Sequence, residues 1–339
     1  MPTFEIPAVG IDLGTTYSVV ARLDEQGRPV TLVNAEGDLL TPSMVLLEGD
    51  EVVVGREAMK AMASEADHVA ECAKRDMGRR IFHKSFNGKQ YPPEVIQAWV
   101  LNKLRRDSIE QIGDYQKVVI TVPAYFDEVR RKATQDAGYM AGFEVLDIIN
   151  EPTAAAVAFG FREGFLDRRG STYEPQRVLV YDLGGGTFDV TVMEIRGSEF
   201  LAMATDGDVQ LGGYDWDQRL VDLVAEGFAR EHGEDPRADP IAAGRLWREC
   251  EEAKRTLSAR PKVPVVCQYH GRTARIEITR EQLAAATEDL LDRTRFTCVQ
   301  ALQAAGLDWS DLDRVLLVGG ATRMPMVRDM LRQVAGKPP

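Results

Sequence analysis

Cysteine is scarce in this sequence, and its distribution argues against a stabilising disulfide framework. The chain of 339 residues contains four cysteines, at Cys72, Cys250, Cys267 and Cys298. They lie far apart, with no Cys-x-x-Cys pair and no histidine at ligand spacing, so a zinc site is not predicted either. We expect four reduced thiols, which is the usual state of cysteine in a cytoplasmic protein.

Long apolar runs and an excess of positive charge are missing as well. No segment approaches the ~20 consecutive apolar residues of a membrane span, and the first ten residues lack the basic and apolar regions of a signal peptide. Lys and Arg number 41 against 53 Asp and Glu, which gives a net charge of −12. Such an acidic chain is a poor candidate for general binding to nucleic acid or to anionic membranes. We therefore expect a cytoplasmic protein that binds neither.

The usual phosphate-binding motifs are also absent. The sequence has no G-x-x-x-x-G-K-[ST] loop and no G-x-G-x-x-G turn that opens a helix. Asp12 has no second aspartate two residues later, which argues against an aspartyl-phosphate nucleophile.

A duplication is the first informative pattern that is present. Residues 9–20 and 178–190 each contain an apolar run, then Asp-Leu-Gly, then small residues with a threonine, then a second β-rich run. Each glycine-containing break predicts a β-hairpin, and the repeat predicts two copies of one supersecondary unit. One such turn could be a plain hairpin. Two matched copies favour two α/β lobes that each present a hairpin tip to a shared cleft.

The chemistry of the two tips suits phosphate and a divalent cation. Each apolar strand ends in a carboxylate, Asp12 or Asp182, which is too costly to bury without a cation or donors. Glycines let backbone N–H groups approach an anion, and threonine hydroxyls add uncharged donors. Mg²⁺ prefers carboxylate oxygens and retained waters. The first tip holds Gly14, Thr15, Thr16 and Tyr17, and the second holds Gly184, Gly185, Gly186 and Thr187.

The remaining elements are predicted from hydrophobic periodicity and from capping residues. Helices are expected at about 92–112, at about 127–141 and from 150 onward, with strands at 118–124, 145–149 and 315–318. Further helices are expected after Gly213, across 250–258, after the capping pair Thr279 and Gln282, and from Pro325.

Two charged features in the first half have both a structural and a functional interpretation. The basic cluster at residues 73–80 could be a solvated face or a nucleic-acid patch. Glu151 lies just past a predicted strand at the start of a helix. It could be a structural carboxylate at the helix N-terminus or a site residue, because sites in α/β sheets often lie there.

Two features in the second half also have both a structural and a functional interpretation. Glu251, Lys254, Arg255 and Ser258 recur at helical spacing and form one polar stripe, which periodicity alone assigns to a solvent face. The Gly319-Gly320 turn between a strand and a helix could lay a base or a ribose against bare backbone.

Five segments together resemble one family. They are Gly10–Thr16, Thr121–Phe126, Asn150–Ala156, Asp182–Asp189 and Val318–Arg323. In this order and spacing they resemble the ATPase domain of DnaK-type chaperones, the heat-shock protein 70 family. The two Asp-Leu-Gly tips are shared with actins and sugar kinases, whereas Thr121–Phe126 and Asn150–Ala156 are typical of the chaperone branch. An actin-like polymerising ATPase and a small-molecule kinase of the same fold are the alternatives.

The resemblance implies an actin-like ATPase fold, an α/β fold of duplicated ribonuclease-H-like lobes around a nucleotide cleft. Lobe I would comprise residues 1–171, with a core at 1–35 and 95–171 and an outer subdomain at 36–94. Lobe II would comprise residues 172–339, with a core at 172–211 and 290–339 and an outer subdomain at 212–289. The family continues beyond Pro339 with a segment that returns to the first lobe, a linker and a peptide-binding domain, which we expect to be absent here.

The resemblance also implies catalytic and metal-binding roles. Lys74 would hold the attacking water and the γ-phosphate, assisted by Glu151, Asp182 and Thr187. Asp12 and Asp182 would bind Mg²⁺ through water, and Asp189 together with Asp182 would bind K⁺. Pro123 and Arg131 resemble the residues that relay the nucleotide state to the rest of the chaperone.

Nucleotide-binding roles are implied for both tips, for the polar stripe and for the Gly-Gly turns. Lys254 and Glu251 would bond the ribose, Arg255 would stack on adenine and Ser258 would bond its edge. The full implied set is Gly14, Thr15, Thr16, Tyr17, Gly184, Gly185, Gly186, Gly212, Gly213, Glu251, Lys254, Arg255, Ser258, Gly319, Gly320 and Arg323. Tyr214 departs from the family, which has an acidic residue there, and would alter the rim of the cleft.

The implied activity is hydrolysis of ATP to ADP and phosphate. The nucleotide state would control lobe closure and, through the peptide-binding domain, the affinity for client peptides. A nucleotide-exchange factor and a J-domain co-chaperone would be partners, and we expect a monomer.

Overall fold

The computed structural model of the chain describes residues 8–162, 175–197 and 199–339. The chain divides into two units. The first contains the residues up to Ala61 together with Asp67–Ala154, and the second contains Met62–Ala66 together with Ala155–Pro339. The lobe boundary predicted at residue 171 and the first seven residues, on which the absence of a signal peptide was argued, lie outside the described residues. The finer division into cores and outer subdomains stays a prediction.

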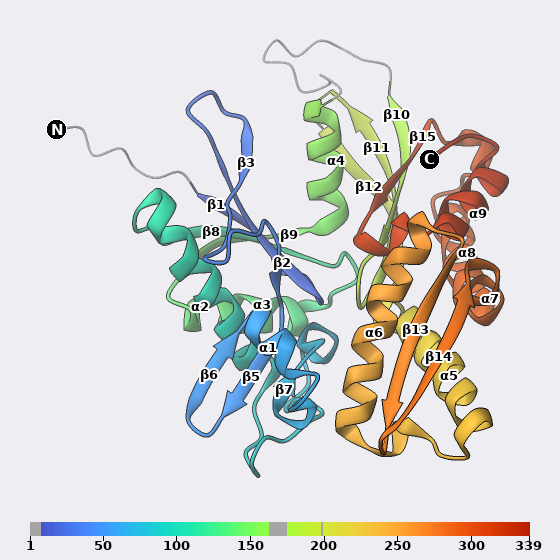
Figure 1. Cartoon of the computed structure of the whole chain (residues 1–339). Coiled ribbons are helices and arrows are strands. Elements are labelled where there is room, and N and C mark those ends of the chain that lie inside the picture. Colours follow the sequence, from blue (N-terminus) through green and yellow to red (C-terminus); the bar gives the residue numbers. More distant parts are fainter. Residues whose placement is uncertain (1–7, 163–174, 198) are drawn as a thin grey trace. The chain divides into compact units, whose positions relative to one another are not determined.

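The elements up to residue 162 are coloured blue to green in Figure 1. In chain order they are β1 (Val9–Asp12), β2 (Tyr17–Leu23), β3 (Pro29–Thr31), β4 (Thr41–Pro42), β5 (Val45–Glu48), β6 (Glu51–Val54), α1 (Arg56–Ala61), η1 (Ala66–His68), β7 (Val69–Ala70), η2 (Ala73–Asp76), α2 (Pro93–Ile112), β8 (Lys117–Val122), α3 (Glu128–Met140), β9 (Glu144–Asn150) and α4 (Glu151–Arg162).

The elements from residue 176 onward are coloured from yellow-green to red. They are β10 (Gln176–Leu183), β11 (Phe188–Arg196), β12 (Glu199–Asp208), α5 (Gly213–His232), η3 (Pro236–Ala238), α6 (Pro240–Ala259), β13 (Lys262–Tyr269), β14 (Arg272–Thr279), α7 (Arg280–Ala286), α8 (Glu288–Ala304), η4 (Trp309–Asp311), β15 (Arg314–Val318), η5 (Gly320–Arg323) and α9 (Pro325–Ala335).

Each unit is built around a sheet with the same strand pattern. In the first, β1 pairs antiparallel with β2 and parallel with β8, in the order β3-β2-β1-β8-β9. In the second, β10 pairs antiparallel with β11 and parallel with β15, in the order β12-β11-β10-β15. The duplicated α/β fold predicted from the two Asp-Leu-Gly segments is thereby confirmed. A further hairpin of β13 and β14 lies against α5 and α6 in the second unit (Figure 1).

The burial of the strands explains their sequences. Most of β10 and β11 is buried at consecutive positions, so these strands are continuous apolar runs, as expected when both faces of a sheet are covered. In β1 the burial alternates, with Val9 and Ile11 buried and Gly10 and Asp12 exposed. The buried side of β1 contributes to the main core of the first unit, which also includes Leu101, Ile120 and Phe82.

The predicted helices form where their capping residues indicate. α3 begins after Asp127, whose side chain accepts a hydrogen bond from the N–H of Arg130, and α7 begins with the predicted reciprocal hydrogen bonds of Thr279 and Gln282. The strand expected at 118–124 is shorter and ends at Val122, because Pro123 has no N–H to continue the ladder. Within the described ranges, no helix combines the length and the hydrophobicity that crossing a membrane requires.

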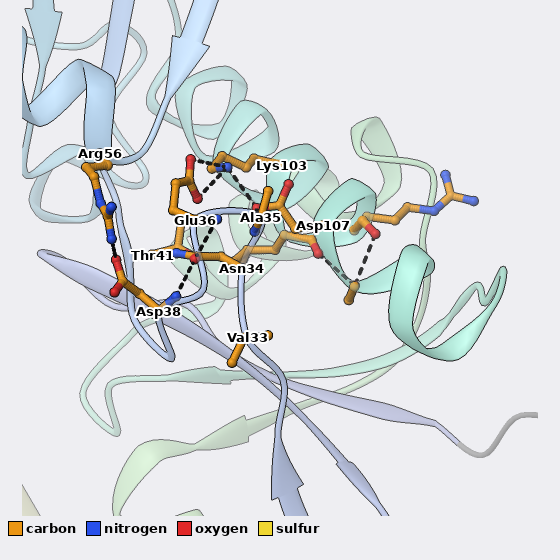
Figure 2. Close-up of polar contacts among 12 residues, drawn as sticks. Val33, Asn34, Ala35, Glu36, Asp38, Thr41, Arg56, Lys103 and Asp107 are labelled. Carbon is orange, nitrogen blue, oxygen red and sulfur yellow. Dashed lines mark hydrogen bonds and ion pairs between the residues drawn. The ribbon is translucent and has the colours of Figure 1, made fainter.

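A buried polar network in the first unit fixes a loop to α2 (Figure 2). Lys103, in the middle of α2, donates to Asp107 at 2.8 Å and to both carboxylate oxygens of Glu36 at 3.0 and 3.2 Å. The side chains of Lys103 and Asp107 are each only 5% exposed. The lysine charge also lowers the pKa of Glu36 against the opposing effect of burial.

Asn34 organises the loop itself. Its Oδ1 accepts hydrogen bonds from the N–H groups of Glu36 and Asp38, at 3.1 and 2.8 Å, and its Nδ2 donates to Thr41 at 3.2 Å. Asp107 accepts from the N–H of Ala35 at 3.3 Å. The side chains of α2 and the backbone of the loop therefore form one hydrogen-bonded body (Figure 2).

Lys103→Ala should lower the free energy of unfolding by about 3–5 kcal/mol, because it leaves the buried carboxylate of Asp107 and the partly buried carboxylate of Glu36 without their cation. Chemical denaturation measures this. The matched control is Lys132→Ala, which removes an exposed ion pair with Asp136 on α3 and should cost less than about 1 kcal/mol. Equal losses in the two variants would show that the network contributes no special stability.

Candidate functional site

The first hairpin tip is held in a form that only glycine allows. Asp12 ends β1, and β2 begins at Tyr17. A Cβ at Gly14 would lie 2.0 Å from the carbonyl oxygen of Tyr17, so no side chain fits there. Thr121, on the neighbouring strand β8, donates its hydroxyl to Oδ1 of Asp12 at 2.8 Å. This hydrogen bond orients the carboxylate at the strand end, and the sequence alone did not assign Thr121 that role.

Lys74 and Glu151 form a close ion pair in the first unit. The ammonium of Lys74, in the short helix η2, donates to Oε1 of Glu151 at 2.5 Å. The two side chains are only 5% and 13% exposed. Burial raises the pKa of Glu151, the charge of Lys74 opposes this, and the negative charge of Asp12 adds to it, with a net increase. Glu151 is thus within electrostatic reach of two other predicted site residues, Lys74 and Asp12.

The basic cluster at residues 73–80 is split by the fold. Lys74 is buried, whereas the side chain of Arg79 is 54% exposed. Asp76 anchors the segment by accepting from Nδ1 of His83 at 2.6 Å and from Arg79 at 2.8 Å. Burial would raise the pKa of Asp76, but the hydrogen bonds and charges of His83 and Arg79 lower it below its ordinary value. Neither of the sequence-based alternatives, a solvated face or a nucleic-acid patch, describes the buried Lys74.

A short strand supports the first tip from behind. β4 pairs with the start of β2, so that Ser18 lies opposite Thr41. The N–H of Ser43 donates to the carbonyl oxygen of Thr16 at 2.8 Å, and the hydroxyls of Ser18 and Ser43 are hydrogen-bonded at 2.8 Å. Both serines are fully buried. Sequence reasoning missed this support, since nothing in the sequence pairs Ser18 with Ser43.

Arg131 ties the loop after β8 to the end of β9. Its guanidinium donates to the carbonyl oxygens of Phe126 and Ala124, at 2.9 and 3.3 Å, and to Oδ1 of Asn150 at 2.5 Å. Pro123 is buried at the start of this loop. Asn150 directly precedes Glu151, so the hydrogen-bond partner of Arg131 is the chain neighbour of the Lys74–Glu151 pair.

The second hairpin tip repeats the arrangement of the first with more buried carboxylates. Asp182 on β10 lies directly opposite Asp189 on β11, and they are 8% and 1% exposed. The N–H of Gly184 donates to the carbonyl oxygen of Thr187 at 3.0 Å and closes the turn. Thr187 is itself buried, at 6% exposure.

The start of α5 is packed onto this tip. The N–H of Gly213 donates to the carbonyl oxygen of Gly184 at 2.9 Å, and that of Tyr214 donates to Gly185 at 2.7 Å. A Cβ at Gly212 would lie 2.5–2.7 Å from the backbone of Gly186. The tyrosine that departs from the family pattern turns its ring toward Trp247, with the ring centres 5.8 Å apart.

The polar stripe on α6 is more than a solvent face. Lys254 donates to the carbonyl oxygen of Gly213 at 2.8 Å and to Oδ2 of Asp217 at 2.7 Å, and its side chain is 12% exposed. Arg255 and Glu251 pair with each other at 2.5 Å, and the arginine is 56% exposed. The hydroxyl of Ser258 donates to the carbonyl oxygen of Lys254 at 3.4 Å.

The Gly319-Gly320 turn follows β15 and faces the end of β10. Gly319 has a φ of 86°, and a Cβ there would lie 2.3 Å from the carbonyl oxygen of Leu183 and 2.7 Å from Oδ1 of Asp182. Both its conformation and its close approach therefore require glycine. Gly320 and Arg323 are exposed, and a Cβ at Gly320 would meet open space.

Asp182 and Asp189 suit a hard cation that also binds phosphate. Among the described residues, no group of three or more His, Cys, Asp and Glu side chains is placed to hold a metal ion by itself. Mg²⁺, however, is commonly bound through one or two carboxylates, its own waters and the phosphates of a nucleotide. The facing carboxylates of Asp182 and Asp189 fit that pattern of donors.

Comparison with known proteins points to one family. The family model described as Hsp70 protein matches residues 8–339. Proteins named chaperone protein DnaK from Thermosipho melanesiensis, Halobacterium salinarum and Thermotoga neapolitana are 41%, 44% and 43% identical over 339, 338 and 340 residues. Each alignment covers 98% of this chain but 55%, 52% and 56% of the relative. The chain thus spans about half the length of the curated relatives it matches.

Gly212→Ala should destabilise the second unit by about 1–3 kcal/mol, because the new methyl group must displace the backbone of Gly186. Thermal unfolding without nucleotide measures this. Gly320→Ala is the matched control, since its methyl group meets no atom within 4 Å and the unfolding midpoint should stay nearly unchanged. A Gly212→Ala variant as stable as the control would contradict the close packing of α5 on the tip.

Proposed function

The chain belongs to the Hsp70 protein family, and on that basis we propose that it binds ATP and hydrolyses the terminal phosphate with water. The observation that carries the proposal is the buried Lys74–Glu151 ion pair within electrostatic reach of Asp12. An ammonium held at a fixed position by a buried carboxylate suits a reaction in which negative charge is redistributed over phosphate oxygens.

The first unit would supply the groups at the reacting phosphate. Lys74 would hold the attacking water and a γ-phosphate oxygen, while Glu151 would orient the ammonium through the 2.5 Å contact. The N–H groups and hydroxyls of Thr15 and Thr16 would bind phosphate oxygens. Positioning and electrostatic stabilisation would provide most of the rate enhancement, because phosphoryl transfer to water needs little covalent help from the protein.

Asp12 and Asp182 would hold Mg²⁺ through its waters, and Asp189 with Asp182 would hold K⁺. The facing, buried carboxylates of Asp182 and Asp189 support this assignment. Bound Mg²⁺ supplies charge neutralisation on the phosphate chain. The hydroxyl of Thr187, at the same tip, would contact the γ-phosphate.

The second unit would supply the nucleoside-binding groups. Glu251 and Lys254 would bond the ribose, Arg255 would stack on the adenine and Ser258 would bond its edge. Gly212, Gly213, Gly319 and Gly320 would let the phosphates and the nucleoside approach bare backbone. The position of Lys254 against Gly213, next to the phosphate tip, supports this arrangement.

The remainder of the chaperone cycle is proposed from the relatives, which are about twice as long. Nucleotide state would control client-peptide affinity through the part of the relatives that this chain does not span, with Pro123 and Arg131 as the relay. A nucleotide-exchange factor and a J-domain co-chaperone would be partners. We further propose a monomer in the cytoplasm. Turnover of ATP to ADP and phosphate with no added acceptor tests the central proposal against a kinase, and the absence of ATP-dependent sedimentation tests it against a polymer.

Lys74→Ala should cut single-turnover ATP hydrolysis by about 10²–10³-fold, the loss expected for one transition-state donor, with ATP binding largely retained. Quenched-flow measurement of phosphate release from preformed complex checks this. The control is Lys84→Ala, which removes a lysine of the same segment that pairs with Glu71 at 3.7 Å. Near-normal hydrolysis by the Lys74 variant would remove this residue from the mechanism.

Arg255→Ala should weaken ATP and ADP by the same factor, about twofold to thirtyfold, because a cation stacked on the base contributes roughly 0.5–2 kcal/mol and the base is common to both. Calorimetric titration measures both affinities. Arg248→Ala, at an exposed position two turns earlier on α6, is the control and should bind both nucleotides normally. A defect confined to ATP would place Arg255 near the γ-phosphate instead.

A further inference from the structure

We infer that Asp217 is a positioning residue that fixes the ammonium of Lys254 for the nucleoside and links the nucleoside-binding stripe to the phosphate tip of the second unit. The inference rests on the proposed function, since it takes Lys254 as a ligand of the nucleotide. It concerns a residue that none of the sequence motifs contains.

The geometry begins with the location of Asp217 on the inner face of α5. It is 2% exposed and lies among the buried residues Trp216, Leu220 and Val221 of the same helix. A carboxylate on the apolar face of a helix is unusual, because its burial is costly without a paired charge. The ammonium of Lys254, 2.7 Å from Oδ2, is that partner.

The hydrogen bonds that Lys254 makes within the protein determine the direction in which its remaining N–H donor can meet a ligand. An ammonium has three N–H donors. One is directed to Asp217 and a second to the carbonyl oxygen of Gly213, at 2.7 and 2.8 Å. These two acceptors fix the orientation of the head group, and the third donor is then available in one direction. A lysine without Asp217 would have a flexible head group and would lose side-chain entropy on meeting a ligand.

The same contacts connect the stripe to the phosphate tip. Gly213 accepts from Lys254 through its carbonyl oxygen, and its N–H donates to Gly184 at 2.9 Å. Asp217, Lys254, Gly213 and Gly184 thus form a continuous hydrogen-bonded series within one unit. A shift of the ammonium should reach the backbone of the tip over two contacts.

Two further observations separate Asp217 from an ordinary ion pair. Its Oδ1 is buried and has no hydrogen-bond partner among the described residues, so Lys254 is its principal compensation. Burial is the largest influence on the pKa of Asp217 and raises it. The charges of Lys254 and Arg255 oppose this increase and the charge of Glu251 adds to it, and the resulting pKa is about 7. The fold therefore retains a costly carboxylate at a place where it holds a predicted nucleotide ligand.

The test is a double-mutant cycle with ADP and ATP as the titrants. Asp217→Asn should weaken both nucleotides by the same factor, about 10- to 100-fold, the value of a hydrogen bond to a charged group. Lys254→Met should weaken both to a similar extent. The double variant should lose no more than the weaker-binding single variant, because both changes disable the same ammonium. Unfolding measured in parallel separates affinity from stability.

Asp222→Asn is the matched control. It is the same substitution on the same helix, and it removes an ion pair with Arg237 at 2.8 Å. Its nucleotide affinities should equal those of the parent chain. If Asp217→Asn does not fold, Asp217→Glu takes its place, since the longer side chain keeps the charge but displaces the ammonium, and the same loss for both nucleotides is expected.

Three outcomes overturn the inference, and they differ in what they say of the proposed function. Normal affinity of the Asp217 variant with a weakened Lys254 variant overturns the positioning role alone and leaves Lys254 a nucleotide ligand. Fully additive losses overturn the coupling between the two residues. Normal affinity of Lys254→Met overturns the nucleoside assignment of Lys254 in the proposed function, and the role of Asp217 with it.

Discussion

Removing a carboxylate from water is costly unless a cation or several donors compensate it. Each unit of this chain contains buried carboxylates, and neighbouring residues supply the compensation. Glu151 has Lys74, Asp217 has Lys254, and Asp107 has Lys103. Asp182 and Asp189 face each other across a buried hairpin, where a bound cation would serve both. Charge pairing thus decides which lysines are buried and where their head groups are held.

The fold could be predicted in large part because its signals are local. The glycine-containing tips, the strand that stops before Pro123 and the capping pair of Thr279 and Gln282 all act within a few residues. The duplication added the long-range element, since two similar segments imply two similar sheets. The parallel pairing of β1 with β8 and of β10 with β15 joins strands that are far apart in the sequence, and the structure was needed to show it.

Individual residues of the site could be predicted from the sequence, but the contacts that hold them in place could not. Asp12 was predicted from the chemistry of the first tip, whereas Lys74 and Glu151 were assigned by family resemblance. In the structure Glu151 pairs with Lys74 and lies within electrostatic reach of Asp12. The contacts that support the site could not be foreseen, because they join different elements of the chain. Thr121 supports Asp12, Ser43 supports Thr16 and Asp217 supports Lys254. The sequence gives a weak indication for Asp217, because a charged residue stands there within the apolar periodicity of α5. Nothing in the sequence indicates the hydrogen bond between the hydroxyls of Ser18 and Ser43.

In the loop fixed by Asn34, exposure to solvent and the rate of amide exchange should not follow each other as they do in most loops. Exposed loops usually exchange their amide hydrogens with water quickly, because their N–H groups lack partners. Here the N–H groups of Asn34, Ala35, Glu36, Gly37 and Asp38 are all hydrogen-bonded, two of them to the side chain of Asn34 and one to Asp107. We therefore expect slow exchange in this segment, although it is in contact with solvent. The loop is held by Asp107 and Lys103 of α2. The rate of amide exchange in the loop should therefore depend on whether α2 is folded and packed on the core of the first unit, and not on how deeply the loop itself is buried.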